Sequence, residues 1–180
     1  MRIISGNLKS RIINVPKSVK NLRPTTDRAR ETLFNILSSR FDIEGKNILD
    51  IFCGSGSLGI ECLSRGSARC AFVDLYPDTV KKNIEALSLG DSSTIVKGDA
   101  VRFLKSARTD EFDLIFADPP YEYKDYDRLL DAAEGLKSVL ILEHSDKFSQ
   151  QEKHSKYLFL RKEVGLAIFS FFDFKRKDEE

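Results

Sequence analysis

Five short apolar runs, each followed by a segment of different periodicity, constrain the fold of this chain more than any other feature. The runs cover residues 47–53, 70–75, 93–97, 112–118 and 138–144. Runs of this length, bounded by polar and glycine residues, are typical of strands buried on both faces. Alternation of such strands with helices predicts a parallel sheet covered by helices on both sides, an α/β fold.

The segments between these runs carry helix signals. Apolar residues recur three and four positions apart, which predicts helices over 57–65, 77–90, 100–107 and 125–135. Pro77 occupies a favoured first helical position, and Gly66 and Gly90 are expected to end the first two helices. In an open sheet of this kind, ligands bind at the carboxyl ends of the strands, where the strand order reverses. The functional residues are therefore expected directly after each strand.

The two ends of the chain add further elements. Weak alternation over residues 2–15 predicts a short hairpin around Gly6, and apolar residues at helical spacing predict an amphipathic helix over 27–40. Arg28, Arg30 and Glu31 are assigned to the exposed face of that helix. The runs YLFLRKE and LAIFSFF flank Val164-Gly165, which predicts an antiparallel hairpin and brings the sheet to seven strands.

Length and composition favour one domain in a reducing compartment. The chain has 180 residues, of which 41% are hydrophobic, enough for a sizeable core. We expect a basic arm and helix over 1–44 and an α/β core over 45–175. The three cysteines are irregularly spaced and are expected in the core rather than in disulfides or a zinc site. No apolar run approaches 18 residues, and the first residues lack the apolar stretch of a signal peptide, so we expect a cytoplasmic protein without membrane contact.

Charge is distributed unevenly along the chain. Residues 1–26 contain no acidic residue and six basic ones: Arg2, Lys9, Arg11, Lys17, Lys20 and Arg23. The remaining residues carry 23 basic and 28 acidic side chains, a net charge of −5. A basic arm on a mildly acidic body favours a polyanionic partner such as nucleic acid, although a solvated surface loop would have the same composition.

A glycine-rich turn follows the first apolar run. Gly54, Gly56 and Gly59 have the spacing G-x-G-x-x-G between a predicted strand and a predicted helix. Glycine allows a tight turn and a close approach of the backbone to a ligand, but this spacing alone is equally compatible with a plain turn. Asp50 precedes the turn and suits a cationic amino group, and Asp74 ends the next strand, where a carboxylate can hold ribose hydroxyls. NAD-binding and S-adenosylmethionine-binding folds share this arrangement.

Two further strand ends carry unusual residues. Asp99 follows the third strand, where it can cap the next helix or accept a hydrogen bond from an adenine amino group. Asp118-Pro119-Pro120-Tyr121 follows the fourth strand. Prolines donate no N–H, so the carbonyl groups of this segment are available to a ligand, and an aromatic ring beside them can stack on a flat base. A rigid turn with no function is the less favoured interpretation.

The chain resembles a known family. The D-P-P-Y segment and D-x-F-x-G-S-G-x-L-G are similar to the amino-methyltransferases that use S-adenosylmethionine. The segments at 2–6, 23–28, 31–37 and 56–66, with Glu143-His144, resemble the bacterial 16S ribosomal RNA guanine-N2 methyltransferase family over nearly the whole chain. The resemblance implies a Rossmann-like class I methyltransferase fold. Cys53, Asp74 and Val164 depart from the residues usual in the family.

The resemblance also implies a role for particular residues. Asp50 with Gly54 and Gly56 would hold the methionine end of S-adenosylmethionine, Asp74 and Leu75 the ribose, and Asp99 and Ala100 the adenine. Asp118, Pro119, Pro120 and Tyr121 would hold the target guanine. RNA would contact the arm at Arg2, Lys9, Arg11, Lys17, Arg23 and Arg28, and we expect the arm to act apart from the cofactor site.

The implied partner is 16S ribosomal RNA within the small ribosomal subunit, bound by a monomer. A DNA adenine-N6 or cytosine-N4 methyltransferase would share D-P-P-Y, but 180 residues leave little room for a target-recognition region. A dehydrogenase would not explain D-P-P-Y, and a non-catalytic RNA-binding protein would not explain the three strand-end aspartates. No metal is expected, because His144 and His154 are distant in sequence and lack obvious partner ligands, and His144 is assigned a structural hydrogen bond.

Overall fold

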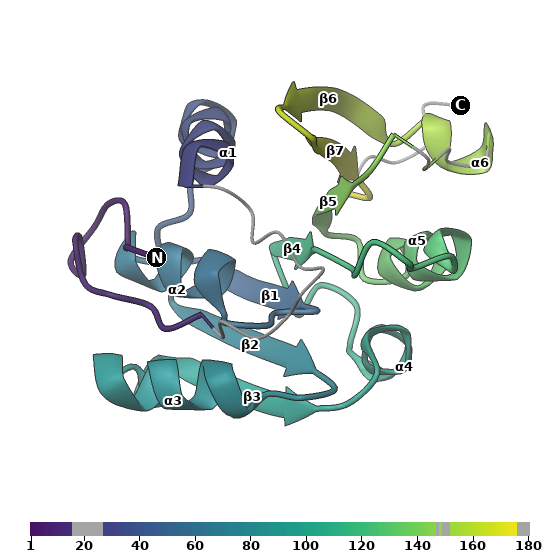
Figure 1. The fold of residues 1–180 in the computed structure, drawn as a ribbon. Coiled ribbons are helices and arrows are strands. Elements are labelled where there is room, and N and C mark those ends of the chain that lie inside the picture. The colour runs from purple at the N-terminus through teal and green to yellow at the C-terminus, as the bar shows by residue number, and fades with distance from the viewer. Residues whose placement is uncertain (16–26, 147, 149–151, 176–180) are drawn as a thin grey trace.

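The structure is a computed structural model that describes residues 1–15, 27–146, 148 and 152–175. Its centre is a seven-stranded sheet in the order β3-β2-β1-β4-β5-β7-β6 (Figure 1). The strands are β1 (Asn47–Ile51), β2 (Arg69–Asp74), β3 (Ser93–Lys97), β4 (Leu114–Ala117), β5 (Val139–His144), β6 (Leu158–Val164) and β7 (Ala167–Asp173). The first five pair in parallel, whereas β7 pairs antiparallel with both β5 and β6. The predicted mostly parallel sheet with a terminal hairpin is confirmed.

The helices are α1 (Asp27–Arg40), α2 (Ser57–Ser64), α3 (Asp78–Leu87), α4 (Ala100–Ser106), α5 (Tyr126–Glu134) and α6 (Glu152–Ser155), with a 3₁₀ turn at Gly90–Ser92. The helices α1 to α5 lie in the segments predicted to be helical, and α6 is an additional helix. None of the helices in the described part of the chain combines the length and the hydropathy of a membrane span.

Successive residues of each strand point to opposite faces, and this alternation divides the core in two. Ile48 packs in a cluster with α1, α2 and α3, whereas its neighbour Leu49 packs in a second cluster with α4 and α5. Strands β1 and β4 are buried over almost their whole length because both clusters cover them. The three cysteines are free and buried, as expected, and burial raises the pKa of each thiol. These thiols are therefore packing groups.

Three sequence-based expectations need correction. Helix α3 ends at Leu87 because Ser88 adopts the left-handed conformation (φ 58°), so Gly90 does not close the helix. The short helix α6 was not predicted. Residues 2–15 form one antiparallel bridge, between Arg2 and Ile12, around a broad turn, and not two regular strands.

The position of the Arg30 side chain also needs correction, because it lies in the core and not on the exposed face of α1. Its side chain is fully buried, with Nη1 3.0 Å from Asp27 Oδ1 and Nη2 3.5 Å from Glu61 Oε2. Nη2 also donates to the carbonyl of Arg2. Burial lowers the pKa of this guanidinium, while the two carboxylates act in the opposite direction. A helical wheel cannot anticipate this partner, since Glu61 is 31 residues away.

Candidate active site

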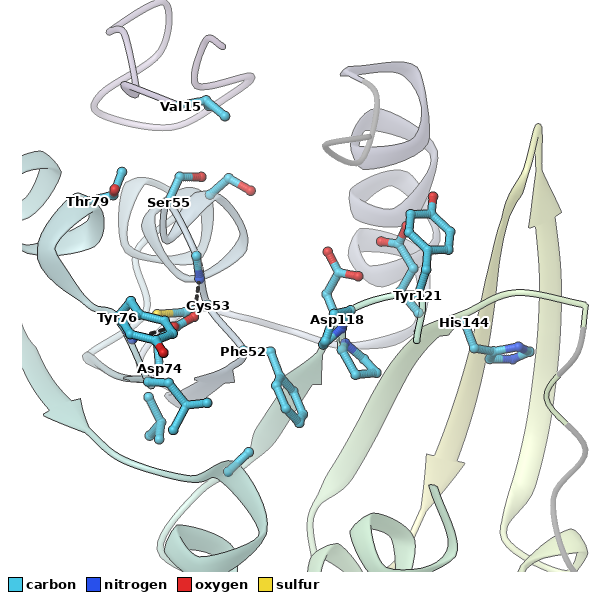
Figure 2. A pocket seen from close by; sticks show the side chains of 18 of the residues that line it. Val15, Phe52, Cys53, Ser55, Asp74, Tyr76, Thr79, Asp118, Tyr121 and His144 are labelled. Atoms are coloured by element: carbon cyan, nitrogen blue, oxygen red, sulfur yellow. Dashed lines mark hydrogen bonds between the residues drawn. The ribbon is translucent and has the colours of Figure 1, made fainter. Parts of the chain in front are cut away.

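The main cavity opens at the carboxyl ends of the parallel strands (Figure 2). Its volume is about 740 Å³. It lies where the strand order reverses between β1 and β4, the position at which α/β folds bind ligands. The four stretches predicted from the strand ends, residues 53–59, 74–76, 98–100 and 118–121, all contribute to its wall.

Asp74 anchors the turn at the end of β2. Its Oδ2 accepts a hydrogen bond from the Gly54 amide at 2.8 Å, and its Oδ1 accepts one from the Tyr76 amide at 2.9 Å (Figure 2). A carboxylate oxygen has two lone pairs, so each oxygen can accept a further bond from a hydroxyl group. Asp74 therefore both fixes the glycine turn and presents acceptors to the cavity, with Leu75 beside it.

The three glycines of the turn have different functions. Gly54 has φ of +53°, lies at the cavity wall, and leaves open space where a side chain would be. A Cβ on Gly56 would lie 2.5 Å from Val80, and one on Gly59 would lie 2.4 Å from Phe72. Gly56 and Gly59 therefore allow α2 to pack closely on the sheet and on α3. Of these three glycines, Gly54 alone lines the cavity, where the lack of a side chain leaves its backbone accessible to a ligand.

Asp50 lies behind this turn. It is 2% exposed, and its Oδ2 accepts a hydrogen bond from the Gly59 amide at 2.9 Å, in the first turn of α2. Burial raises its pKa to about 8, against the opposing effect of that hydrogen bond. Among the described residues, neither Asp50 nor Gly56 belongs to the cavity wall, so both support the predicted cofactor turn from behind.

Asp99 caps a helix and also lines the cavity, so the two alternatives left open by the sequence do not exclude each other, and the contact with adenine stays a prediction. Its Oδ1 accepts a hydrogen bond from the Arg102 amide at 2.8 Å and so caps α4. Asp99 and Ala100 also line the cavity. Capping uses one lone pair of the carboxylate, which leaves acceptors for a ligand.

The D-P-P-Y segment forms the opposite side of the cavity from Asp74 (Figure 2). Pro119 is buried, whereas Tyr121 is 53% exposed and presents its ring at the rim. The Pro120 carbonyl accepts a hydrogen bond from the Tyr123 amide at 2.8 Å, which closes a tight turn after Asp118. A carboxylate and a half-exposed aromatic ring thus share one edge of the cavity.

His144 borders this edge but is held by the protein. Its Nε2 lies 2.8 Å from Ser170 Oγ, and its Nδ1 lies 2.7 Å from the Ser145 carbonyl. Burial lowers its pKa, which favours the neutral ring. These contacts agree with the structural hydrogen bond assigned from the sequence.

Sequence reasoning missed part of the wall. Met1 and Val15 of the N-terminal arm line the cavity, so the arm does not lie apart from this site as expected. Tyr76, 79% exposed, and Leu166 of the β6–β7 turn, 70% exposed, also contribute. The exposed ring at the end of β2 could have been found by the strand-end argument, whereas the arm carries no local signal for its position.

The basic residues predicted to contact RNA are partly described. Arg2, Lys9, Arg11 and Arg28 are exposed, while Lys17 and Arg23 lie outside the described residues. Arg11 also donates to the carbonyl of Ala86 at 3.2 Å, so this side chain helps to hold the arm on α3.

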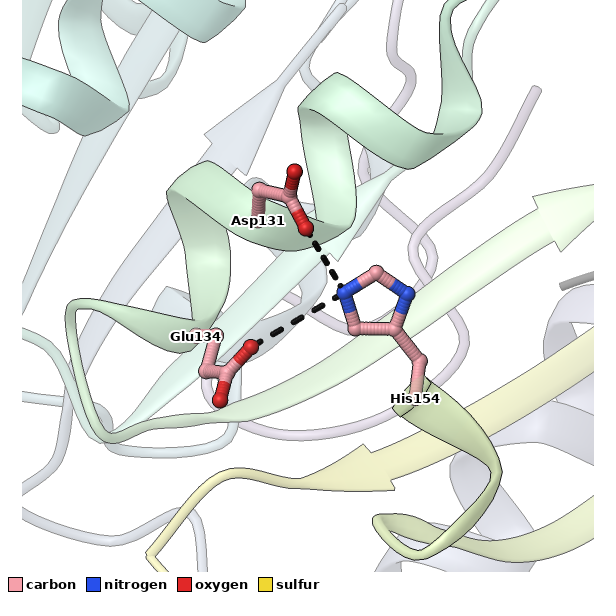
Figure 3. Close-up of side chains that lie close together, drawn as sticks. All are labelled: Asp131, Glu134 and His154. Atoms are coloured by element: carbon pink, nitrogen blue, oxygen red, sulfur yellow. Dashed lines mark ion pairs between the residues drawn. The ribbon is translucent and has the colours of Figure 1, made fainter. Parts of the chain in front are cut away.

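A second cluster of polar residues joins α5 to α6, away from the cavity (Figure 3). His154 is fully buried, with Nε2 3.0 Å from Asp131 Oδ1 and 3.8 Å from Glu134 Oε2. The Lys153 ammonium lies 2.6 Å from Asp131 Oδ1 and lowers the pKa of that carboxyl. These partners of His154 were not predicted, because Asp131 and Glu134 lie more than one helix turn away in sequence. The Lys153 ammonium already pairs with Asp131, and the Tyr157 hydroxyl donates to Glu134 Oε1 at 2.7 Å, so we describe the cluster as a polar network between two helices.

Comparison with known proteins agrees with this geometry. YlbH of Bacillus subtilis, provisionally named as an rRNA methyltransferase, is 36% identical over 183 residues, covering 94% of this chain and 98% of its own length. Ribosomal RNA small subunit methyltransferase D of Buchnera aphidicola (strain APS) is 40% identical over 154 residues, covering 84% of this chain and 78% of its own. The solved structure of Escherichia coli YhhF, provisionally titled a methyltransferase, has a TM-score of 0.79 at 30% identity and covers 96% of this chain and 97% of that one.

The family assignment extends over nearly the whole chain. The sequence model of the family described as "Conserved hypothetical protein 95" matches residues 1–173. That match includes the arm, the glycine turn, and the D-P-P-Y segment, which are the parts that form the cavity. The chain therefore belongs to this family, that of the RsmD-like rRNA methyltransferases.

Proposed function

We propose that this protein transfers a methyl group from S-adenosylmethionine to the exocyclic N2 amine of a guanine in 16S ribosomal RNA of the small subunit. One observation carries the proposal: Asp118 and Tyr121 face Asp74 across a single cavity (Figure 2), which Pro119 and Gly54 also line. A methyl donor held on one side would thus meet a base held on the other. The small-subunit enzyme of Buchnera, with 40% identity, supports the choice of RNA.

The residues of the cavity fit S-adenosylmethionine. A volume of about 740 Å³ suits a ligand of that size. We assign the ribose to Asp74 with Leu75, the adenine to Asp99 with Ala100, and the methionine end to the turn at Gly54, which Asp50 supports from behind. When bound, S-adenosylmethionine supplies an electrophilic methyl group on a sulfonium centre.

Asp118 and Pro119 are assigned to the target amine. The exocyclic amine of guanine is a poor nucleophile because its lone pair is delocalised into the ring. Hydrogen bonds from its two N–H groups to the Asp118 carboxylate and the Pro119 carbonyl would favour tetrahedral geometry at nitrogen and aim the lone pair at the methyl group. The same carboxylate would stabilise the positive charge that develops on nitrogen. A carboxylate is too weak a base to deprotonate this amine first, so the proton leaves after transfer.

Tyr121 is assigned to the base itself. A guanine must leave its stack to reach the cavity, which costs a few kcal/mol. Stacking on an aromatic ring returns about 1–3 kcal/mol per base. The half-exposed ring of Tyr121 at the rim is placed to receive a base in this way. The exposed basic residues of the arm and Arg28 would contact phosphates, which position the RNA without selecting the base.

The test is methyl transfer from labelled S-adenosylmethionine to three substrates: small ribosomal subunits lacking the modification, naked 16S RNA, and DNA. Digestion to nucleosides followed by mass spectrometry identifies the product. The proposal predicts N2-methylguanosine from the subunit. Label found only in adenine, cytosine or DNA would refute the assignment of the substrate.

A further inference from the structure

The N-terminal arm, residues 1–15, is fixed to the protein by buried polar groups. Glu61 of α2 accepts hydrogen bonds from the amides of Ile4 (2.8 Å) and Ser5 (3.0 Å). Ser64 of the same helix accepts one from the Leu8 amide at 3.0 Å. These contacts join segments 56 or 57 residues apart in sequence. The first half of the arm is therefore docked on α2.

The last part of the arm is held by one side chain of α3. Asn83 is 1% exposed, and its Oδ1 accepts a hydrogen bond from the Asn14 amide at 2.9 Å. Its Nδ2 donates to the Asn14 carbonyl at 3.0 Å and to the Ser55 carbonyl at 2.9 Å. Both amide hydrogens of Asn83 are thus used, one on the arm and one on the glycine turn.

Asn83 binds one residue of the cavity wall and the neighbour of another. Ser55 lines it directly, and Val15, the residue after Asn14, lines it above Ser55 (Figure 2). If the turn moved away, Nδ2 would lose a partner in a buried place, which costs about 1–3 kcal/mol. The positions of the turn and of the arm are therefore energetically linked through a single buried amide.

We infer that Asn83 is a positioning residue that couples the cofactor site to the RNA-binding arm. A ligand that contacts the glycine turn fixes Ser55, which strengthens the hold of Asn83 on Asn14 and orders the arm. By reciprocity, RNA that binds the ordered arm raises the affinity for the cofactor by the same factor. The identity of the two ligands rests on the proposed function, whereas the link between turn and arm rests on the contacts of Asn83 alone.

The link is tested by amide hydrogen exchange at Asn14, with S-adenosylhomocysteine as the probe. Saturating probe should slow this exchange by at least about fivefold, the lower end of typical coupling. Asn83→Ala should abolish the slowing at probe concentrations that still saturate the variant. Lys82→Ala, a change at the exposed neighbouring residue of α3, is the matched control and should respond as the wild type does.

A ligand-free measurement separates this inference from the proposed function. Gly54→Ala forces a side chain into a backbone with φ of +53° and so disturbs the turn without any probe. It should speed exchange at Asn14 in the wild-type background and have no further effect in the Asn83→Ala background. Absence of probe binding would refute the proposed function. The measurement on Gly54→Ala without a ligand would still decide whether the glycine turn and Asn14 are coupled.

The wild-type and Gly54→Ala proteins give an answer even where Asn83→Ala does not fold. Exchange at Asn14 that responds neither to bound probe nor to Gly54→Ala would overturn the inference. An Asn83→Ala protein that folds and shows the wild-type responses would overturn it as well. In both cases methyl transfer could proceed, and the proposed function would stand.

Discussion

Replacing Asp74 with alanine removes the carboxylate that joins the glycine turn to the end of β2. The two hydrogen bonds lost, from Gly54 (2.8 Å) and Tyr76 (2.9 Å), both lie at exposed positions. Water can replace the acceptor there, so the free energy of unfolding should fall by only about 0.5–1.5 kcal/mol. Loss of charge-assisted bonds to the ribose should weaken cofactor binding by about 1.5–3 kcal/mol. That corresponds to a roughly 10- to 150-fold rise in Kd.

Calorimetric titration with S-adenosylmethionine, together with thermal melting, measures both effects. Asp74→Asn should give an intermediate affinity, because its one remaining oxygen can keep one of the two backbone bonds. Asp78→Ala is the matched control, since Asp78 is an exposed carboxylate four residues further on, outside the cavity wall. A folded Asp74→Ala protein with wild-type affinity would remove Asp74 from the cofactor site and refute the reasoning.

Three further predictions follow from the same structure. Asp118→Ala should abolish methyl transfer to the small subunit while cofactor affinity stays within a few-fold, and Asp118→Asn should keep part of the activity; near-wild-type turnover in the alanine variant would contradict the mechanism. Neutralising Lys9 and Arg11 together should make the salt dependence of RNA binding less steep. The negative slope of log affinity against log salt should lose slightly under one unit of magnitude per lost phosphate contact, as measured by subunit binding at several salt concentrations. An unchanged slope would show that these side chains make no contact with phosphates. Burial raises the pKa of Asp50 to about 8, so this carboxyl is protonated in the folded protein below that pH. In the unfolded chain it is ionised above about pH 4. The free energy of unfolding should therefore fall as pH rises from about 4 to 8. Thermal melts of Asp50→Asn across that range should lack this part of the slope, and an identical slope would contradict the buried, protonated state.

Most of the fold could be predicted because its signals are local. The apolar runs mark the strands within a few residues, and the periodicity over 27–40 gives the bounds of α1. The error at the end of α3 has an equally local cause: a serine, Ser88, takes the left-handed position that glycine usually occupies. Helix α6 was missed because four residues are too few for a periodic pattern.

The cavity was predictable where its residues follow a strand directly. Asp74, Asp99 and Asp118 all line it, because parallel strands end at one edge of the sheet. Asp50 was harder to interpret, since a carboxylate inside a strand can face a ligand or, as here, hold the helix that follows. The positions of Met1 and Val15 in the wall could not be predicted from the sequence, because the contacts that hold the arm join residues up to 69 positions apart.

The number of basic residues in the N-terminal arm does not by itself define a surface that binds RNA. Composition alone treats every arginine near the N-terminus as available to RNA. In the structure the Arg11 guanidinium holds the end of α3, and the buried Arg30 donates to the Arg2 carbonyl and pairs with Glu61, which itself holds Ile4 and Ser5. Part of the positive charge thus docks the arm on α2 and α3, where it forms a wall of the cavity. Arg11 of the described arm thus has a docking contact in addition to its proposed contact with RNA, and its substitution is expected to affect both the position of the arm and the binding of RNA.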